Sequence, residues 1–150
     1  MDLNHVHADL KEFLRLLNEN KVEYVIIGGY AVNFYGYHRM TDDLDVFVAI
    51  HPDNARRLMA TLEAFGFWSV APGEKAFLKR RKIFRMGRKP TCIELMTTID
   101  GVSFDECFEA RQIADIGGVE VPFIGLEQLK QNKQASGRHK DLDDLEHLSS

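Results

Sequence analysis

The chain has 150 residues, of which 45% are hydrophobic and 28% are charged, and it carries a net charge of −4. This length suits one domain with a sizeable core, and the composition argues against a disordered, fibrous or membrane-spanning chain. The amino-terminal segment lacks the basic and apolar regions of a signal peptide, and Cys92 and Cys107 lack zinc-ligand spacing. We therefore expect one reduced, cytoplasmic domain over residues 1–150, with residues 125–150 as a C-terminal helical pair that completes the site.

Hydrophobic periodicity and the positions of Gly, Pro and capping residues predict alternating helices and strands. The strands are expected at Tyr24–Ile27, Asp43–Val48, Phe67–Val70, Phe77–Met86, Thr91–Met96, Gln112–Ile116 and Val119–Ile124. The helices are expected at His7–Asn20 with Asn4 as a cap, Tyr30–Tyr35, Pro52 to Gly66, Ser103–Ala110, Leu126–Ser136 and Lys140–Leu148. The apolar positions of the last helix would be Leu142, Leu145 and Leu148.

A pair of glycines, Gly28 and Gly29, separates the first strand from the short helix Tyr30–Tyr35. Backbone N–H groups at the start of a helix attract anions, and glycine has no Cβ to keep a ligand away. We therefore predict that phosphate binds at this glycine pair.

Two aspartates, Asp43 and Asp45, open the second strand. Side chains alternate along a strand, so both carboxylates point to one face while Leu44, Val46 and Val48 point into the core. A lone Asp-x-Asp is more often a solvated strand end. Beside a phosphate-binding turn, however, the two carboxylates are the hard oxygen ligands that Mg²⁺ prefers.

A third carboxylate could come from the strand Thr91–Met96. Ile93 and Leu95 share one face of this strand, so Glu94 points to the other face and could meet the two aspartates. The alternative is a glutamate on a solvent-exposed face, and Asp100 is a weaker candidate for the third carboxylate.

The junction between the last two predicted helices is rich in charge. Lys133, Arg138 and Lys140 could each place a positive charge on a triphosphate, and Asp141 could orient one of these cations or act as a base. In isolation, these residues would be ordinary solvated charges at helix ends.

The segment before Asp43 holds two polar candidates and several aromatic ones. Arg39 and Thr41 could contact phosphate or could only stabilise the loop. Tyr30, Phe34 and Tyr35 could stack on a base, although core packing is the stronger interpretation.

Two separated motifs resemble the nucleotidyltransferase superfamily of DNA polymerase β. The first is Gly28-Gly29, thirteen intervening residues and then Asp43-Leu44-Asp45; the second is Lys133 followed by Arg138-His139-Lys140-Asp141. With Tyr35-Gly36, Arg39 and Thr41, they are similar to its small prokaryotic branch, the AbiEii-like and minimal nucleotidyltransferases. The likeness extends from Val22 to Leu148, and it implies an α/β fold (α+β in finer schemes) with a small mixed sheet and helices mainly on one side.

This resemblance implies that an NMP moves from a Mg²⁺-bound NTP, either ATP or CTP, to an acceptor hydroxyl. Asp43, Asp45 and Glu94 would be metal ligands, and two Mg²⁺ ions about 3.5–4 Å apart would be bridged by the aspartates. Mn²⁺ could replace Mg²⁺. The catalytic residues would be Asp43, Asp45, Glu94 and Asp141, and the nucleotide-binding residues would be Gly28, Gly29, Arg39, Thr41, Lys133, Arg138 and Lys140.

The acceptor could be a nucleic acid, a protein or a small molecule. Relatives often carry a larger helical domain for the acceptor, so here a second copy of the chain in a homodimer, or a partner protein, could hold it. No membrane partner is expected.

A basic segment, residues 75–89, carries eight Lys and Arg residues and no acid, so the rest of the chain has a net charge of −12. Its central basic residues are interleaved with Phe77, Ile83 and Phe84 and could lie along a nucleic-acid backbone such as that of tRNA. These residues are Lys79, Arg80, Arg81, Lys82 and Arg85. The alternative is a charged edge strand that resists pairing with another sheet.

A second class of function is an inactive nucleotide-binding module, such as a regulatory partner in a toxin–antitoxin pair. The presence of the acids at 43, 45, 94 and 141 together with Lys133 argues against it, because an inert copy has no chemical need for all of them. The chain has no P-loop and no Gly-x-Gly-x-x-Gly motif.

Overall fold

A computed structural model describes residues 7–66, 72–87 and 92–148, and its strands form one mixed sheet in the order β3-β4-β2-β1-β6-β5. The strands are β1 (Tyr24–Ile27), β2 (Asp43–Val48), β3 (Ile83–Met86), β4 (Cys92–Met96), β5 (Gln112–Ile116) and β6 (Val119–Phe123). Strand β2 runs antiparallel to β1 and parallel to β4, and β1 runs parallel to β6. The edge strands β3 and β5 are each antiparallel to their neighbour, so the predicted α/β fold with a small mixed sheet is confirmed.

The described helices occupy most of the predicted positions. They are α1 (Ala8–Glu19), α2 (Gly28–Phe34), α3 (Pro52–Phe65), the 3₁₀ helix η2 (Glu74–Leu78), α4 (Phe104–Glu109), α5 (Leu126–Ser136) and α6 (His139–Leu148). None of these helices is both long and apolar enough to span a bilayer, as judged over the described residues.

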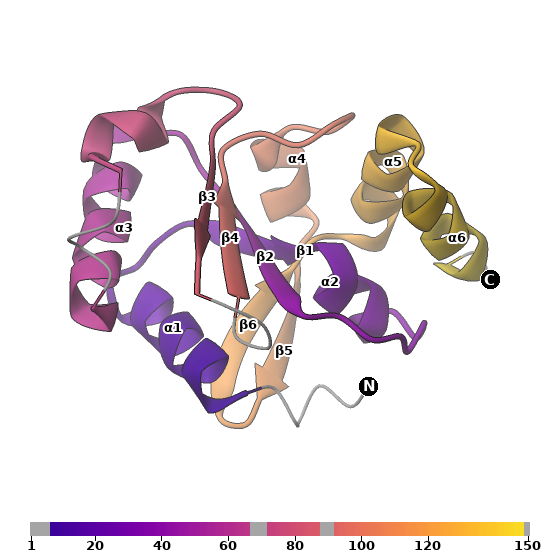
Figure 1. The fold of residues 1–150 in the computed structure, drawn as a ribbon, viewed down its shortest axis with the longest axis horizontal. Coiled ribbons are helices and arrows are strands. Elements are labelled where there is room, and N and C mark those ends of the chain that lie inside the picture. Colours follow the sequence, from indigo (N-terminus) through magenta and orange to yellow (C-terminus); the bar gives the residue numbers. More distant parts are fainter. Residues whose placement is uncertain (1–6, 67–71, 88–91, 149–150) are drawn as a thin grey trace.

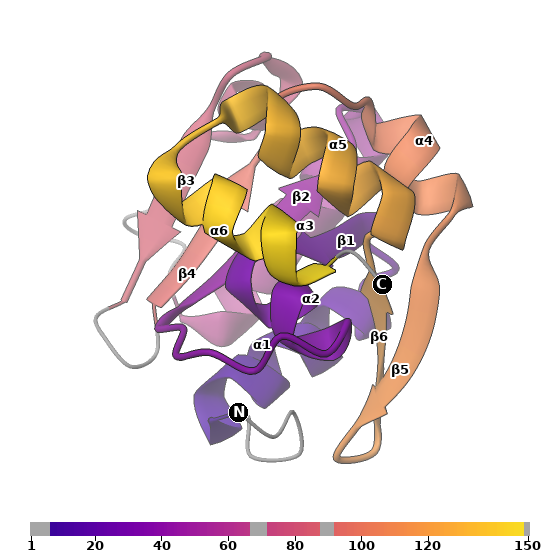
Figure 2. The same ribbon diagram turned by 90° about the vertical axis from the view of Figure 1, so that its right-hand side faces the viewer.

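The helices form layers on the two faces of the sheet (Figure 1). On one face α1 and α3 pack together, with Phe13 and Phe65 in an edge-on contact at a ring-centroid distance of 5.1 Å. On the other face α4 packs through Phe104 against Phe47 of β2. Figure 2 shows α5 and α6 in front of the strands on this second side. The C-terminal helices therefore face the side of the sheet on which Asp43 and Asp45 project.

Local signals in the sequence explain where several helices begin and end. His51 caps α3, Pro52 is its first residue, and Gly66 ends it in a left-handed conformation with φ 98°. Ser103 and Glu106 form a reciprocal capping box at the start of α4. The capping predicted for Asn4 lies outside the described residues, and His7 caps α1 in the structure.

Two predicted elements differ from the structure. The strand predicted for Phe77–Met86 is wrong over its first half, because Phe77 is buried within η2 and pairing begins only at Ile83. The exposed run of basic residues between them favours a loop, because like charges repel. Gly28 and Gly29 are the first two residues of α2 rather than a separate turn. The predicted strand 67–70 and most of the predicted turn 87–90 lie outside the described residues.

Candidate active site

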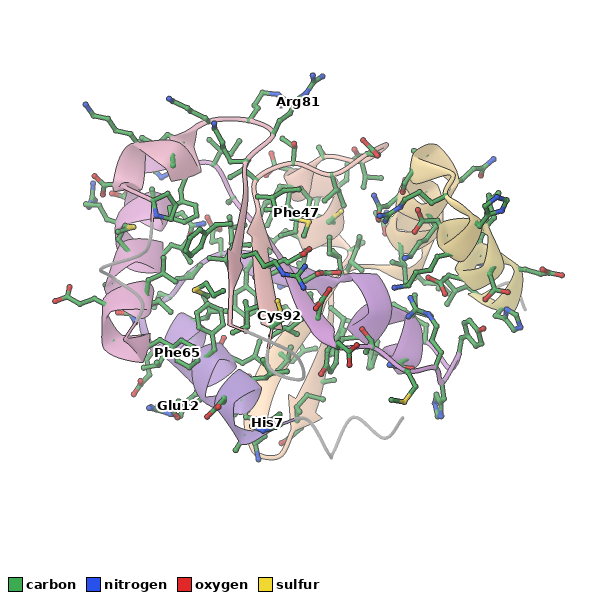
Figure 3. All side chains as sticks on the ribbon, in the orientation of Figure 1. His7, Glu12, Phe47, Phe65, Arg81 and Cys92 are labelled. Atoms are coloured by element: carbon green, nitrogen blue, oxygen red, sulfur yellow. The ribbon has the colours of Figure 1, made fainter. Side chains whose placement is uncertain are left out.

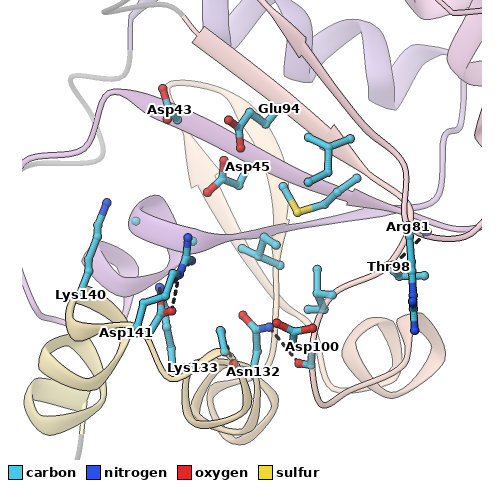
Figure 4. A pocket seen from close by; sticks show the side chains of 18 of the residues that line it. Asp43, Asp45, Arg81, Glu94, Thr98, Asp100, Asn132, Lys133, Lys140 and Asp141 are labelled. Carbon is cyan, nitrogen blue, oxygen red and sulfur yellow. Dashed lines mark hydrogen bonds and ion pairs between the residues drawn. The ribbon is translucent and has the colours of Figure 1, made fainter.

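The register of the sheet aligns Ile27, Asp45, Glu94 and Arg85 in one row across β1, β2, β4 and β3. Paired residues on neighbouring strands project to the same face. Asp43 lies two residues before Asp45 and therefore shares that face. The structure thus brings the three predicted carboxylates together on one face of the sheet (Figure 4).

These carboxylates line a cleft of about 560 Å³ between the sheet and the C-terminal helices (Figure 4). One wall holds Gly28 and Gly29, and the opposite wall is formed by predicted site residues of α5 and α6 and of the turn that joins them. These opposing residues are Lys133, Arg138, Lys140 and Asp141. Asp100 and Arg81 lie toward the other end of the cleft, where the Asp100 carbonyl accepts a hydrogen bond from the Asn132 side chain at 2.9 Å.

The two glycines are required by the close approach of neighbouring side chains. Gly28 has φ 66°, and a Cβ on it would lie 2.1 Å from Asp45 Oδ2. A Cβ on Gly29 would lie 2.4 Å from Thr41 Oγ1. The glycine pair therefore allows the Asp45 and Thr41 side chains to pack against the start of α2.

Asp43 and Asp45 have the features of metal ligands. Oδ1 of each is buried and accepts no hydrogen bond from the described residues, although such oxygens in proteins usually have a partner. Burial, followed by the negative charges of Glu94 and Asp43, raises the pKa of Asp45 to about 7. Buried carboxylate oxygens that accept no hydrogen bond fit a hard divalent cation such as Mg²⁺, whose charge would offset the repulsion between the carboxylates.

The third carboxylate is held differently from the other two. Glu94 accepts a hydrogen bond from Arg85 Nη1 at 2.6 Å, and Arg85 Nη2 also lies 3.5 Å from Asp43 Oδ1. Among the described residues, no group of three or more His, Cys, Asp or Glu side chains is arranged to hold a metal ion by itself. The fit to a metal therefore rests on the two aspartates, with substrate phosphates and water completing the shell as is usual for Mg²⁺.

A buried charge network fixes α6 onto α5 and onto the loop before β2. The Lys133 ammonium lies 3.2 Å from Asp141 Oδ1 and 3.0 Å from Asp144 Oδ2. Asp144 is fully buried and also accepts two hydrogen bonds from Arg39, at 2.7 and 2.8 Å. The prediction that Leu142 belongs to the buried face of α6 is wrong, because this side chain is 47% exposed. The buried positions are Asp141, Asp144 and Leu148, since the helix meets cations rather than an apolar surface.

Of the two roles predicted for Asp141, the geometry favours the orientation of cations. Its carboxylate accepts hydrogen bonds from Lys133 and from Arg138 Nε, the latter at 2.7 Å. Burial by itself would raise the pKa of Asp141, but the hydrogen bonds from Arg138 and Lys133 outweigh it and leave the pKa lowered. An ionised carboxylate already engaged with two cations is a poor base.

The two polar residues before β2 stabilise the loop. Arg39 donates its backbone N–H to Asn33 Oδ1 at 2.8 Å and its guanidinium to Asp144. The Thr41 hydroxyl donates to the Asp43 carbonyl at 3.4 Å. Arg39 also lines the cleft, so contact with a ligand remains open to it.

The aromatic residues of α2 pack into the protein. Tyr30 is 4% exposed, Phe34 stacks on Phe123 at a centroid distance of 4.4 Å, and the Tyr35 hydroxyl donates to the Ile124 carbonyl. These contacts support the core interpretation over stacking on a base.

The sequence analysis did not identify Asp144 as a site residue and did not predict the contacts of Arg85 with the acids. Asp144 follows Asp141 by one turn of helix, a spacing that could have marked a second buried acid. Arg85 belongs to the basic segment, and the pairing of β3 with β4 in the structure puts it opposite Glu94.

Comparisons with known proteins identify a family and two structures of similar fold. The sequence profile of the family described as "Nucleotidyl transferase of unknown function (DUF2204)" matches residues 6–150. A candidate nucleotidyltransferase from Thermotoga maritima has a similar structure, with a TM-score of 0.60 and 15% identity, over 92% of this chain and 88% of that chain. An antigenic nucleotidyltransferase-like protein from Paracoccidioides brasiliensis has a TM-score of 0.54 and 16% identity, over 95% of this chain and 77% of that chain.

At such identities the two structures establish similarity of fold alone, and the comparison with curated proteins found no match. The family profile, by contrast, spans nearly the whole chain. The chain therefore belongs to the nucleotidyl transferase family of unknown function (DUF2204).

Proposed function

We propose that this protein transfers a nucleoside monophosphate from a Mg²⁺-bound NTP to an acceptor hydroxyl. One observation carries the proposal: buried oxygens of Asp43 and Asp45 lack hydrogen-bond partners among the described residues and line a cleft whose opposite wall is basic. A metal-bound triphosphate needs oxygen ligands for its metal on one side and positive charge for its phosphates on the other.

Each wall of the cleft then has a defined task. Asp43 and Asp45 supply ligand oxygens, while the backbone of Gly28 and Gly29 stays close to the phosphates because neither residue has a Cβ. Bound Mg²⁺, or Mn²⁺ in its place, would supply neutralisation of phosphate charge and acidification of the acceptor hydroxyl. Little covalent work falls to the protein, so correct positioning and electrostatic stabilisation dominate.

The basic wall binds and orients the triphosphate. Lys133 is positioned by two carboxylates, and Arg138 is held by Asp141 while its side chain remains 74% exposed to the cleft and solvent. Lys140 is exposed and adds a further positive charge. In this assignment Asp141 is a positioning residue, and Glu94 either becomes a third ligand or remains with Arg85.

This proposal does not specify which molecule carries the acceptor hydroxyl or whether the nucleotide is ATP or CTP. The two sequence motifs resemble those of the AbiEii-like branch, and a role in a toxin–antitoxin pair is part of this proposal as the alternative to catalysis. The basic segment supports a nucleic acid such as tRNA as acceptor, and a second copy of the chain or a partner protein could complete the acceptor site.

The decisive experiment incubates purified protein with α-³²P-labelled ATP or CTP, Mg²⁺ and cell extract, and it detects label on protein, nucleic acid or small molecules. Asp43→Asn and Asp45→Asn should each reduce transfer by about 10²-fold or more, because oxygen ligands of the metal are lost. Asp42→Asn is the matched control, since this neighbouring acid does not line the cleft. Circular dichroism checks that each variant is folded.

The possible results separate the two classes of function. Label transfer that depends on Asp43 and Asp45 supports the enzyme. Nucleotide binding without transfer to any acceptor supports the inactive regulatory module instead. Full turnover in either Asn variant contradicts the proposed mechanism.

A further inference from the structure

Arg85 occupies an unusual place among the basic residues of its segment. It lies on β3 directly opposite Glu94, in the same row of the sheet as Asp45. Its guanidinium bridges two carboxylates, with Nη1 2.6 Å from Glu94 Oε1 and Nη2 3.5 Å from Asp43 Oδ1. A positive charge therefore lies at the edge of the face on which the predicted metal ligands gather.

The charges around Arg85 explain why a cation is needed there when no metal is bound. Asp43, Asp45 and Glu94 project from one face of the sheet, where their like charges repel one another. Lys133 lines the same cleft, but its ammonium is shared by Asp141 and Asp144. Among the residues that the structure describes, Arg85 is the cation in direct contact with two of these three carboxylates, Asp43 and Glu94.

The Arg85 side chain is also able to move away. It is 51% exposed, and its contact with Asp43 is nearly 1 Å longer than its contact with Glu94. Ion pairs between partly exposed side chains are weak, so a divalent cation can displace such a contact. Asp43 Oδ1 accepts no hydrogen bond from any described residue, so the contact with Arg85 does not saturate it.

We propose that Arg85 is the resident counter-ion of the metal site and competes with the divalent metal for Asp43 and Glu94. This inference rests on the metal site of the proposed function but not on nucleotide transfer. It makes Arg85 a positioning residue with opposite effects on two properties: it stabilises the metal-free protein and weakens metal binding.

The test compares Arg85→Gln with Arg80→Gln, which removes the same charge from an exposed position of the same basic segment. Binding of Mn²⁺ is measured from the electron paramagnetic resonance signal of the free ion, and Tm is measured in EDTA and with excess Mn²⁺. Arg85→Gln should bind Mn²⁺ about tenfold more tightly than wild type, as expected for removal of a positive charge a few ångströms from a divalent ion. Arg80→Gln should change affinity by about twofold or less, because solvent and salt screen exposed charges over longer distances.

Stability should change in the opposite direction. In EDTA, Arg85→Gln should lower Tm by about 2–4 °C relative to Arg80→Gln, equivalent to the loss of one weak stabilising contact in a domain of this size. Excess Mn²⁺ should remove that difference. Arg85→Lys retains the charge and should keep the wild-type Mn²⁺ affinity within about twofold, whereas loss of a merely structural guanidinium contact would make it resemble Arg85→Gln.

The results also separate this inference from the proposed function. Equal or weaker Mn²⁺ affinity in Arg85→Gln than in Arg80→Gln overturns the counter-ion role, even if the wild type transfers nucleotides. If Arg85→Gln binds Mn²⁺ more tightly than Arg80→Gln but the wild-type protein transfers no nucleotide, the counter-ion role is supported and the proposed transferase activity is contradicted. Absence of Mn²⁺ binding by both wild type and Arg85→Gln contradicts both.

Discussion

The carboxylate of Asp45 packs against the start of α2 so closely that Gly28 has no room for a side chain. A Cβ at this position would lie 2.1 Å from Asp45 Oδ2 and 3.2 Å from Asp45 Cβ. The second of these contacts involves an atom next to the backbone, which cannot move without shifting the strand. At the residue scale, therefore, Gly28 determines where Asp45 can be.

We expect Gly28→Ala to weaken Mn²⁺ binding by about tenfold or more, because the new methyl group displaces a carboxylate that supplies hard oxygen ligands. The control is Gly66→Ala at the end of α3, where φ is 98° and no atom lies within 4 Å of the added Cβ. Backbone strain should cost each variant roughly 1–2 kcal/mol of stability, and Gly28→Ala should lose more because its methyl group also meets Asp45. Free-ion Mn²⁺ titration and urea unfolding measure the two effects. Similar Mn²⁺ affinities in the two variants would mean that Gly28 matters only for its backbone conformation.

At the scale of elements, α6 is attached to the protein by charge rather than by a leucine stripe. Asp141 and Asp144 are buried on its inner face, while Leu142 points outward. Lys133 of α5 and Arg39 of the loop before β2 neutralise these acids. The same contacts orient the cations that line the cleft, so the docking of α6 and the shape of the basic wall depend on each other.

We predict that Asp144→Asn destabilises the protein by roughly 3 kcal/mol or more, since removing one member of a buried ion network leaves other charges uncompensated. Asp143→Asn, one residue earlier on the exposed face of the same helix, should cost about 1 kcal/mol or less. Equilibrium urea unfolding of the two variants and the wild type gives the comparison. Equal losses would show that burial of Asp144 has no energetic consequence.

Over the whole molecule, charge is separated into a basic segment and an acidic remainder. Figure 3 shows Arg81 projecting outward from the loop between η2 and β3, and the same residue lines one end of the cleft. Lys79, Arg80 and Lys82 are exposed in that loop. A nucleic acid bound along this surface would reach the cleft at Arg81. Arg85 of the same segment instead forms ion pairs with Asp43 and Glu94.

We expect tRNA to bind at low salt and the Arg80→Gln/Arg81→Gln double variant to reduce the slope of log K against log salt by about 1.5–2, because two phosphate contacts are lost. Arg56→Gln/Arg57→Gln on α3 removes two exposed arginines elsewhere and should leave the slope unchanged. Fluorescence anisotropy at several salt concentrations measures it. No tRNA binding by the wild type even at low salt would exclude this surface as a nucleic-acid site and favour its interpretation as a charged edge.

Most of the strands and helices were predictable because their signals are local. Gly66 and the Ser103–Glu106 capping box act within one helical turn. The segment Phe77–Met86 was not predictable in the same way, because burial of Phe77 depends on packing of η2 against α3. The exposed basic residues that follow it have no apolar alternation strong enough to specify a strand.

By itself, the sequence determined that a glycine pair follows one strand and that Asp43 and Asp45 share a face of the next. The alternation of side chains and the conformational freedom of glycine are properties of the local backbone. Only the tertiary structure decided that Arg85 meets Glu94 and that Asp144 meets both Lys133 and Arg39. A charged side chain pairs with whichever opposite charge the packing brings within a few ångströms, and for Arg39 and Asp144 that partner is 105 residues away.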